Sequence, residues 1–330
     1  MKAVIQSGHG DPAQVLRVLD VPAEQPEADE VVVRMEAAAM HIADLRTITG
    51  DDDTFKFPVP RTPGFEGIGR VVRVGSAVTA YQVGDRVFPA LASGTFREEV
   101  RCKAEGCLPA PASGDPIQLS LLTVNGPTAE VLLEDFADLG RGDWLIQNAA
   151  NSSCGRYLIR LARLKGVRTV NVVRRPEMVQ DLLDLGGDVV LVDGPDLAAR
   201  VAAAVGGAPV KLGIDAVAGA ATQRIAECLA PGSTVASYGS MTNQRCELDF
   251  YLMFRNDIRL VGVAFVRQFA LKRTPQQVRE MYARLADLMA RGELVAKIAG
   301  VYTLDQVVEA CARAGRTGAD RDGKVILKIG

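Results

Sequence analysis

A short turn near the middle of the chain carries residues suited to holding a dinucleotide. The apolar run Trp144–Asn148 leads into the small residues 149–155 (AANSSCG), after which the spacing is helical. Such a turn lets backbone N–H groups approach a pyrophosphate, and the helix N-terminus stabilises the negative charge. Only Gly155 is kept of the usual G-x-G-x-x-G pattern, so an ordinary strand, turn and helix stays open as the alternative. The candidate cofactor residues here are Asn151, Ser152, Ser153, Cys154 and Gly155.

Two arginines follow the next strand-like run, Thr169–Val173. A site that prefers NAD places Asp or Glu about 20 residues after the turn, against the ribose 2′-hydroxyl. Here the run ends in Arg174 and Arg175, and guanidinium groups suit a 2′-phosphate. We therefore expect NADPH as the cofactor.

A third candidate segment, residues 237–241, follows the fifth strand-like run of the same half of the chain. Ligands of open α/β sheets bind at the carboxyl ends of the strands, and a glycine permits close approach of a cofactor. This segment adds Tyr238, Gly239, Ser240 and Met241 to the candidate cofactor residues.

The ionisable side chains that remain for acid–base chemistry are His41, Asp44, Glu66, Tyr81 and Tyr238. For each of them taken alone, a structural role is the stronger interpretation. A catalytic zinc needs about three protein ligands. The chain has 2 histidines and 6 cysteines, and the cysteines show no C-x₂-C spacing. We expect no metal site.

Composition narrows the class of protein. The 330 residues suit about two domains, and the net charge of −2 predicts no general attraction to nucleic acid. No apolar run approaches the roughly 20 residues of a membrane-spanning helix. The N-terminal residues pass directly into strand-like sequence without a signal or transit segment. Scattered cysteines form no disulfide framework, so we expect a reducing, cytoplasmic setting.

The pattern of elements predicts an α/β fold in two parts. Residues 1–110 are β-rich and punctuated by glycine and proline. Residues 119–139 have helical spacing, and five strand–helix units and a sixth strand follow, which predicts a doubly wound parallel sheet. Two helices, 274–291 and 304–314, and a last strand, 325–329, complete the chain.

This order resembles that of the medium-chain dehydrogenase/reductase superfamily. Within it, residues 123–129, 143–152 and 171–174 look like the zinc-free 2-enoyl thioester reductases, and residues 238–241 and 254–262 extend the match. The resemblance implies a GroES-like domain made of 1–118 with 267–330, and a Rossmann domain, 119–266. It also implies NADPH, a homodimer, and reduction of an α,β-unsaturated thioester. We further expect the cofactor to contact Asn125, Thr128, Phe265 and Lys324.

The half that would hold the substrate departs from that resemblance. Zinc-bearing relatives have Cys and His where this chain has His41 and Phe65. The thioester reductases usually have Asn at the position of His41, and a catalytic tyrosine at the position of Asp52. The candidate catalytic residues are therefore His41, as a donor to a developing oxyanion, and Asp52, which helps only when protonated.

The reaction expected is hydride transfer from NADPH to the β-carbon of an activated C=C bond, followed by protonation of the α-carbon. The acceptor is a small molecule or a substrate linked to coenzyme A or a carrier protein. Two alternatives stay open. One is a zinc-free NADPH:quinone or enone reductase, and the other is an NADPH-binding module that has lost catalysis.

Overall fold

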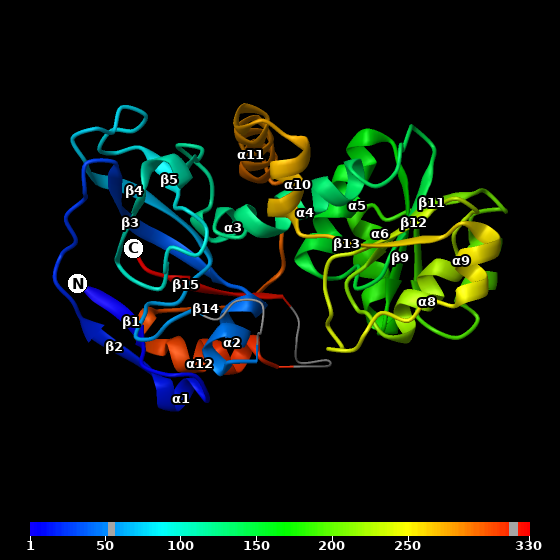
Figure 1. Ribbon diagram of the computed structural model, residues 1–330, viewed down its shortest axis with the longest axis horizontal. Helices are drawn as coiled ribbons and strands as arrows, with labels where there is room; N and C mark the ends of the chain where they lie inside the picture. The colour runs from blue at the N-terminus through cyan, green and yellow to red at the C-terminus, as the bar shows by residue number, and fades with distance from the viewer. Residues whose placement is uncertain (52–56, 317–322) are drawn as a thin grey trace. The chain divides into compact units, whose positions relative to one another are not determined.

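The computed structural model describes residues 1–51, 57–316 and 323–330 (Figure 1). The chain forms two compact units, of which the first comprises 1–124 with 279–330 and the second 125–278. The domain limits expected from the sequence, 118/119 and 266/267, lie earlier in both places. The start of helix α4 (Leu122–Glu134) stays with the first unit because Glu66 accepts a hydrogen bond from Val124 N at 3.1 Å. Helix α10 stays with the second unit because the adjacent Arg273 is ion-paired with Asp135 at 2.9 Å.

The first unit is built on a mainly antiparallel sheet in the order β14-β15-β3-β4-β5-β7, with β6 also pairing with β3 and a separate β1–β2 hairpin. Its strands are β1 (Lys2–Gln6), β2 (Leu16–Asp20), β3 (Glu30–Met40), β4 (Glu66–Val74), β5 (Arg86–Phe88), β6 (Glu99–Lys103), β7 (Leu108–Pro109), β14 (Ile298–Tyr302) and β15 (Lys324–Lys328). Its helices are α1 (Pro12–Val15), α2 (Ile42–Thr49), η1 (Ala104–Gly106), α3 (Pro116–Leu119), α11 (Pro275–Ala290, which begins in the second unit), η3 (Leu304–Gln306) and α12 (Val307–Ala314).

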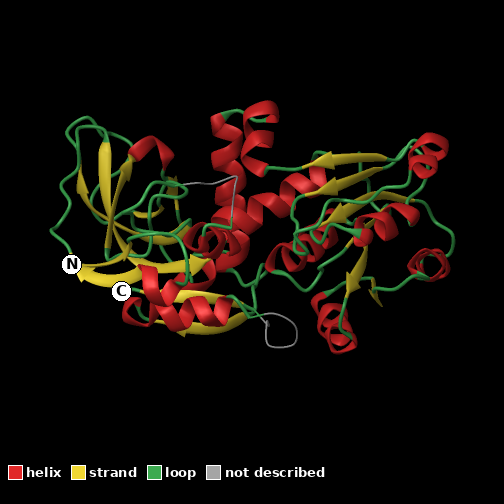
Figure 2. Ribbon diagram, turned by 60° about the horizontal axis from the view of Figure 1, so that its bottom comes forward, coloured by secondary structure: helices red, strands yellow, loops and turns green. Residues whose placement is uncertain are grey.

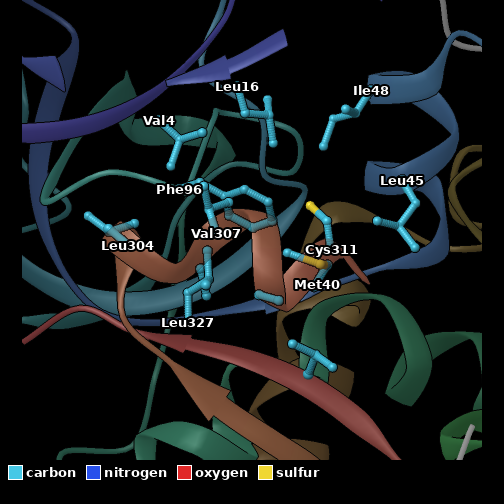
Figure 3. Close-up of a cluster of buried hydrophobic side chains, with 13 residues drawn as sticks. Val4, Leu16, Met40, Leu45, Ile48, Phe96, Leu304, Val307, Cys311 and Leu327 are labelled. Atoms are coloured by element: carbon cyan, nitrogen blue, oxygen red, sulfur yellow. The ribbon is translucent and has the colours of Figure 1, made fainter. Parts of the chain in front are cut away.

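Two apolar clusters fill this unit. Figure 3 shows the first, where side chains of α12 pack with Val4 of β1, Leu16 of β2 and Ile48 of α2. The second lies under β3 and β6 and includes Val31, Val100, Cys102 and Cys107. Burial of these side chains supplies the main stabilisation of the unit.

The second unit is a six-stranded sheet in the order β10-β9-β8-β11-β12-β13, with every pair of neighbours parallel. In chain order this is 3-2-1-4-5-6, the Rossmann arrangement, which confirms the predicted α/β fold class. The strands are β8 (Trp144–Gln147), β9 (Arg168–Val173), β10 (Val189–Val192), β11 (Val210–Asp215), β12 (Thr234–Ser237) and β13 (Arg259–Gly262).

Helices flank that sheet (Figure 2). They are α4, α5 (Ser153–Lys165), η2 (Pro176–Met178), α6 (Val179–Leu185), α7 (Leu197–Ala204), α8 (Ala220–Glu227), α9 (Phe250–Asn256) and α10 (Phe265–Lys272). The single helical segment expected over 119–139 is instead split between α3 and α4, and α4 ends at Glu134. The strand order reverses between β8 and β11, so the crevice at their carboxyl ends is where this fold binds its ligands.

Candidate functional site

The turn between β8 and α5 has the geometry of an anion-binding turn, although it keeps a single glycine. Ser152 is the N-cap of α5, and its Oγ accepts from Gly155 N at 3.1 Å. A Cβ at Gly155 would lie 2.6 Å from the Ala150 carbonyl oxygen, so only glycine fits there. Ala149 has a left-handed backbone, with φ of 48°, where a dinucleotide turn more often has glycine.

A buried carboxylate, Asp215, lies at the end of β11 beside this turn. Its Oδ1 accepts from Asn148 Nδ2 at 2.6 Å and from two backbone amides that follow it, Val217 N at 2.9 Å and Ala218 N at 3.1 Å. Its Oδ2 accepts from Thr222 Oγ1 at 2.7 Å. Charge-assisted hydrogen bonds of this kind are the stronger ones in proteins. Asp215 therefore joins the turn after β8 to the turn after β11 at the point where the strand order reverses.

The segment after β12 is hydrogen-bonded to the end of β11 and the turn that follows it. Tyr238 N donates to the Asp215 carbonyl oxygen at 2.9 Å, and Met241 N donates to the Ala216 carbonyl oxygen at 3.1 Å. Burial, and then the neighbouring Cys154 thiol, raise the pKa of the Tyr238 hydroxyl well above its usual value, while a hydrogen bond with Ser152 acts in the other direction. The structure thus brings together Ser152, Cys154 and Tyr238, which the sequence proposed as separate cofactor residues.

The two arginines after β9 differ in their surroundings. Arg174 is exposed and makes no ion pair with any residue that the structure describes. Arg175 is partly buried, with Nη1 3.6 Å from Glu177 Oε1 and Nη2 3.5 Å from Met178 Sδ. The guanidinium of Arg174 is therefore the one ready to bind a phosphate.

The remaining expected cofactor residues lie on other elements. Asn125 and Thr128 are buried on α4, Phe265 begins α10, where its ring packs 5.5 Å from that of Phe269, and Lys324 begins β15 in the first unit. Asn151 and Gly239 lie in turns of the second unit, next to the segments described above.

In the first unit, His41 holds the start of α2. Its Nδ1 accepts from Ala43 N at 3.2 Å, and its own backbone N donates to Asp44 Oδ2 at 2.7 Å, so the two residues form a capping box. Because Nδ1 is an acceptor, the proton of the neutral imidazole is on Nε2. The second catalytic candidate, Asp52, lies outside the described residues.

Two carboxyl groups are fully buried near this cap, and the sequence had named both among the ionisable candidates. Burial raises the pKa of Asp44 to about 7 against the hydrogen bond from His41, and the charge of Glu66 raises it further. Burial also raises the pKa of Glu66 to about 7, although the charge of Lys324 lowers it.

Glu66 has a specific structural task. Its Oε2 accepts from Thr123 Oγ1 at 3.2 Å and from Val124 N at 3.1 Å, in the first turn of α4. Its Oε1 is also buried, and it has no hydrogen-bond partner among the residues that the structure describes. Buried polar atoms that stay unpaired are rare in native proteins and concentrate at sites that do chemistry or store strain.

The described residues were also searched for groups that could hold a metal ion and for helices that could cross a membrane. Over 1–51, 57–316 and 323–330, no group of three His, Cys, Asp or Glu side chains is placed to hold a metal ion. In the same residues, no helix is both long and apolar enough to cross a membrane.

Comparison with known proteins places the chain in a family. Residues 27–112 match the alcohol dehydrogenase GroES-like domain, and residues 154–291 match the zinc-binding dehydrogenase model. The mitochondrial enoyl-[acyl-carrier-protein] reductase of Caenorhabditis elegans is 34% identical over 89% of this chain and 86% of its own length. The human enzyme of the same name is also 34% identical, over 90% of this chain and 80% of its own length.

Two solved structures resemble the chain over nearly its whole length. A mycobacterial quinone oxidoreductase shares 27% identity with a TM-score of 0.86, covering 99% of each chain. A mycobacterial protein solved in complex with NADPH shares 27% identity with a TM-score of 0.85, covering 99% of this chain and 100% of the other.

These relatives correct one expectation from the sequence. The curated relatives from worm, mouse, human and Arabidopsis are all mitochondrial enzymes, so the cytoplasmic setting was wrong. The lack of a disulfide framework indicates a reducing compartment but does not say which one. The matches over both units, with the Rossmann strand order, show that the chain belongs to the medium-chain dehydrogenase/reductase superfamily, together with the enoyl thioester reductases.

Proposed function

We propose that this protein reduces the C=C bond of a 2-enoyl thioester, with NADPH as the hydride donor and without a metal. The observation that carries the cofactor part is Arg174, an exposed guanidinium at the end of β9, where an NAD-preferring site has a carboxylate. The thioester part rests on the enoyl-[acyl-carrier-protein] reductases, which are 34% identical over about nine-tenths of the chain.

The residues of the second unit fit NADPH. The first amides of α5 favour the pyrophosphate, and Arg174 favours the 2′-phosphate. Gly155 and Gly239 allow close approach, and the remaining contacts are assigned to Asn125, Thr128, Asn151, Ser152, Ser153, Cys154, Arg175, Tyr238, Ser240, Met241, Phe265 and Lys324. NADPH supplies the hydride that saturates the alkene.

The first unit supplies a hydrogen-bond donor for the reaction. Reduction at the β-carbon builds negative charge on the thioester oxygen, and that charge needs a fixed donor. We assign this task to His41 Nε2–H, because Nδ1 is already committed to Ala43 N. Helix capping holds the imidazole in one tautomer.

A panel of acceptors tests the proposed function. The enzyme is mixed with NADPH and crotonyl-CoA, a longer 2-enoyl-CoA, a simple enone or an ortho-quinone, and nicotinamide absorbance is followed. We expect turnover of the thioesters. Turnover of the quinone or enone alone selects the quinone-reductase alternative, which the mycobacterial quinone oxidoreductase supports. NADPH binding without turnover of any acceptor selects the non-catalytic module.

We also propose that the protein is a homodimer that forms along strand β13. This strand is at the edge of the sheet and pairs with β12 on one side only. Beside it in sequence, α9 exposes Phe250 by 61% and Phe254 by 73%, with their rings stacked at 5.7 Å. Monomers rarely expose such a patch or leave an edge strand uncovered.

A second copy satisfies both features, because a two-fold axis pairs one edge strand with the same strand of its partner. Light scattering after size exclusion should give twice the mass of the chain. Phe254→Glu should shift the protein to the monomer, whereas Val83→Glu, on another exposed apolar residue, in the first unit, should stay dimeric. A wild-type monomer at micromolar concentration would contradict the dimer.

A further inference from the structure

Two thiols meet in the core of the first unit, outside the elements assigned to cofactor or substrate. The Sγ atoms of Cys102 and Cys107 are 3.4 Å apart, within hydrogen-bond distance for sulfur. Cys102 is on β6, where it faces Val31 of β3 in the strand register. Cys107 follows the short helix η1, and both thiols are free.

The surrounding backbone fixes this geometry. Cys107 N donates to the Ala104 carbonyl oxygen at 3.1 Å, which closes the turn between the two cysteines. The Tyr81 hydroxyl donates to the Cys107 carbonyl oxygen at 2.7 Å from the other side. Burial raises the pKa of Tyr81 to about 12, so this donor keeps its proton at physiological pH. These backbone bonds, together with a hydrogen bond from Cys107 Sγ to the Lys103 carbonyl oxygen at 3.6 Å, hold the two sulfurs side by side.

The pair differs from ordinary buried cysteines in its electrostatics. The contact between the two sulfurs lowers the pKa of Cys102 and raises the pKa of Cys107. Cys102 is also the one of the two with some exposed surface, so we assign the attacking thiolate to Cys102 and leave the proton on Cys107. Thiolates, not thiols, react with oxidants.

Only a short turn separates the two sulfurs from solvent. Cys102 is 7% exposed and Cys107 is fully buried, yet Lys103, Glu105 and Gly106 in the turn between them are exposed. A small opening of this turn brings an oxidant to Cys102. A disulfide then requires the sulfurs to approach by about 1.3 Å, because an S–S bond is about 2.05 Å long.

We propose that Cys102 and Cys107 are a redox modification site, a dithiol that a hydroperoxide converts to a disulfide. The Cys102 thiolate attacks the terminal oxygen of the hydroperoxide, the O–O bond breaks, and an alcohol or water leaves. This gives a sulfenic acid on Cys102. The Cys107 sulfur then attacks that sulfur, the S–O bond breaks, and the Cys107 proton leaves with the hydroxide as water. Two thiols lose two electrons and two protons in total, and the peroxide takes up both.

The test uses the folded wild-type protein, hydrogen peroxide in small excess and a maleimide quench, followed by intact mass and peptide mapping. We expect a loss of two of the 6 thiols, a peptide linkage between Cys102 and Cys107, and full reversal by dithiothreitol. Recovery of all thiols, oxidation without this linkage, or a linkage found only after denaturation would each overturn the proposal. The readout is thiol chemistry, so it is independent of the enzymatic activity proposed above.

Variants separate the roles of the two sulfurs. Cys107→Ser should stop at a sulfenic acid on Cys102 that dimedone traps, and Cys102→Ser should give neither product. Cys228→Ser is the matched control, because its half-buried sulfur donates to the Arg224 carbonyl oxygen at 3.1 Å, and it should oxidise like the wild type. If a core variant does not fold, the peptide map of the wild type decides the question alone.

Discussion

Two buried carboxylates, one in each unit, are held in contrasting ways. Asp215 at the end of β11 accepts hydrogen bonds on both oxygens, from backbone amides and from side chains of neighbouring turns. Glu66 at the start of β4 accepts hydrogen bonds on one oxygen, and the other is buried with no partner among the described residues. The polar network proposed to hold the cofactor is therefore satisfied on both carboxylate oxygens, whereas the proposed substrate side keeps a carboxyl group whose charge is costly.

The largest effect is expected from removing the satisfied carboxylate. Asp215→Leu leaves the Val217 and Ala218 amides and the Asn148 amide buried without their acceptor. Each buried donor left without its acceptor costs about 1–3 kcal/mol, so urea should unfold the variant at a much lower midpoint. Asp215→Asn is the control, since its carbonyl still accepts from those donors, and it should lose less than half as much. Equal losses in the two variants would show that the network does not depend on acceptors at Oδ1.

At neutral pH we expect the Glu66 carboxylate to lower the free energy of unfolding, whereas Asp215 raises it. The pKa of Glu66 rises from the ordinary 4.5 to about 7 on folding. The folded state therefore binds more protons than the unfolded state between these values, and stability falls as pH rises from about 4.5 to about 7. At 1.36 kcal/mol per pKa unit the loss is on the order of 3 kcal/mol.

Glu66→Gln should remove the part of the pH dependence that comes from Glu66 and leave the part that comes from Asp44, whose pKa is raised in the same way. The variant should be more stable than the wild type at pH values above about 7, because the amide oxygen still accepts from Val124 N. Chemical unfolding at a series of pH values measures this. Glu105→Gln, on an exposed residue of the same unit, is the control and should follow the wild-type profile. If the stability of Glu66→Gln depended on pH in the same way as that of the wild type, Glu66 would not be the source of this pH dependence.

The arginine assignment is expected to appear as a change of cofactor preference. Arg174→Ala loses a charge-assisted contact with phosphate, which costs about 1.5–3 kcal/mol. NADPH should therefore bind about 10- to 100-fold more weakly, with NADH affinity unchanged, as calorimetry can show. Arg175→Ala should have a smaller effect, because that side chain is already paired with Glu177. An unchanged NADPH/NADH ratio in Arg174→Ala would exclude its role.

The smallest effect on stability separates capping from chemistry at His41. His41→Ala removes the side-chain acceptor for Ala43 N and should cost about 1 kcal/mol. His41→Ser keeps a good capping residue, so its thermal midpoint should stay close to that of the wild type. If His41 Nε2–H stabilises the oxyanion, both variants lose kcat, because serine is too short to replace that donor. A normal kcat in His41→Ser would leave capping as the only role of this residue.

The sequence predicted the cofactor unit better than the substrate unit for a physical reason. Buried parallel strands such as β8 and β12 are short, mostly apolar runs between turns, which are easy to recognise. Strands β2 and β14 of the first unit were missed because they are short and expose many of their side chains. Helix α10 was missed for the same reason. Partly exposed elements leave a weaker hydrophobic period.

The residues of the candidate site could also be predicted only where a local sequence pattern marks them. The turn after β8 and Arg174 could be found from their spacing, but Asp215 is a lone acidic residue after an apolar strand and has no motif of its own. The raised pKa of Asp44 and Glu66 depends on burial among residues distant in sequence, which no local pattern reports. The contact between Cys102 and Cys107 likewise depends on the bend at η1, which no motif in the sequence marks.

The proposed reduction is best tested by following the hydride itself. Enzyme is incubated with crotonyl-CoA and NADPH carrying deuterium at C4, in separate reactions for each of the two faces, and the product is analysed by mass spectrometry. We expect butyryl-CoA with one deuterium at the β-carbon, from one of the two labelled cofactors only. Unchanged crotonyl-CoA with both cofactors, under conditions where NADPH is bound, would contradict it.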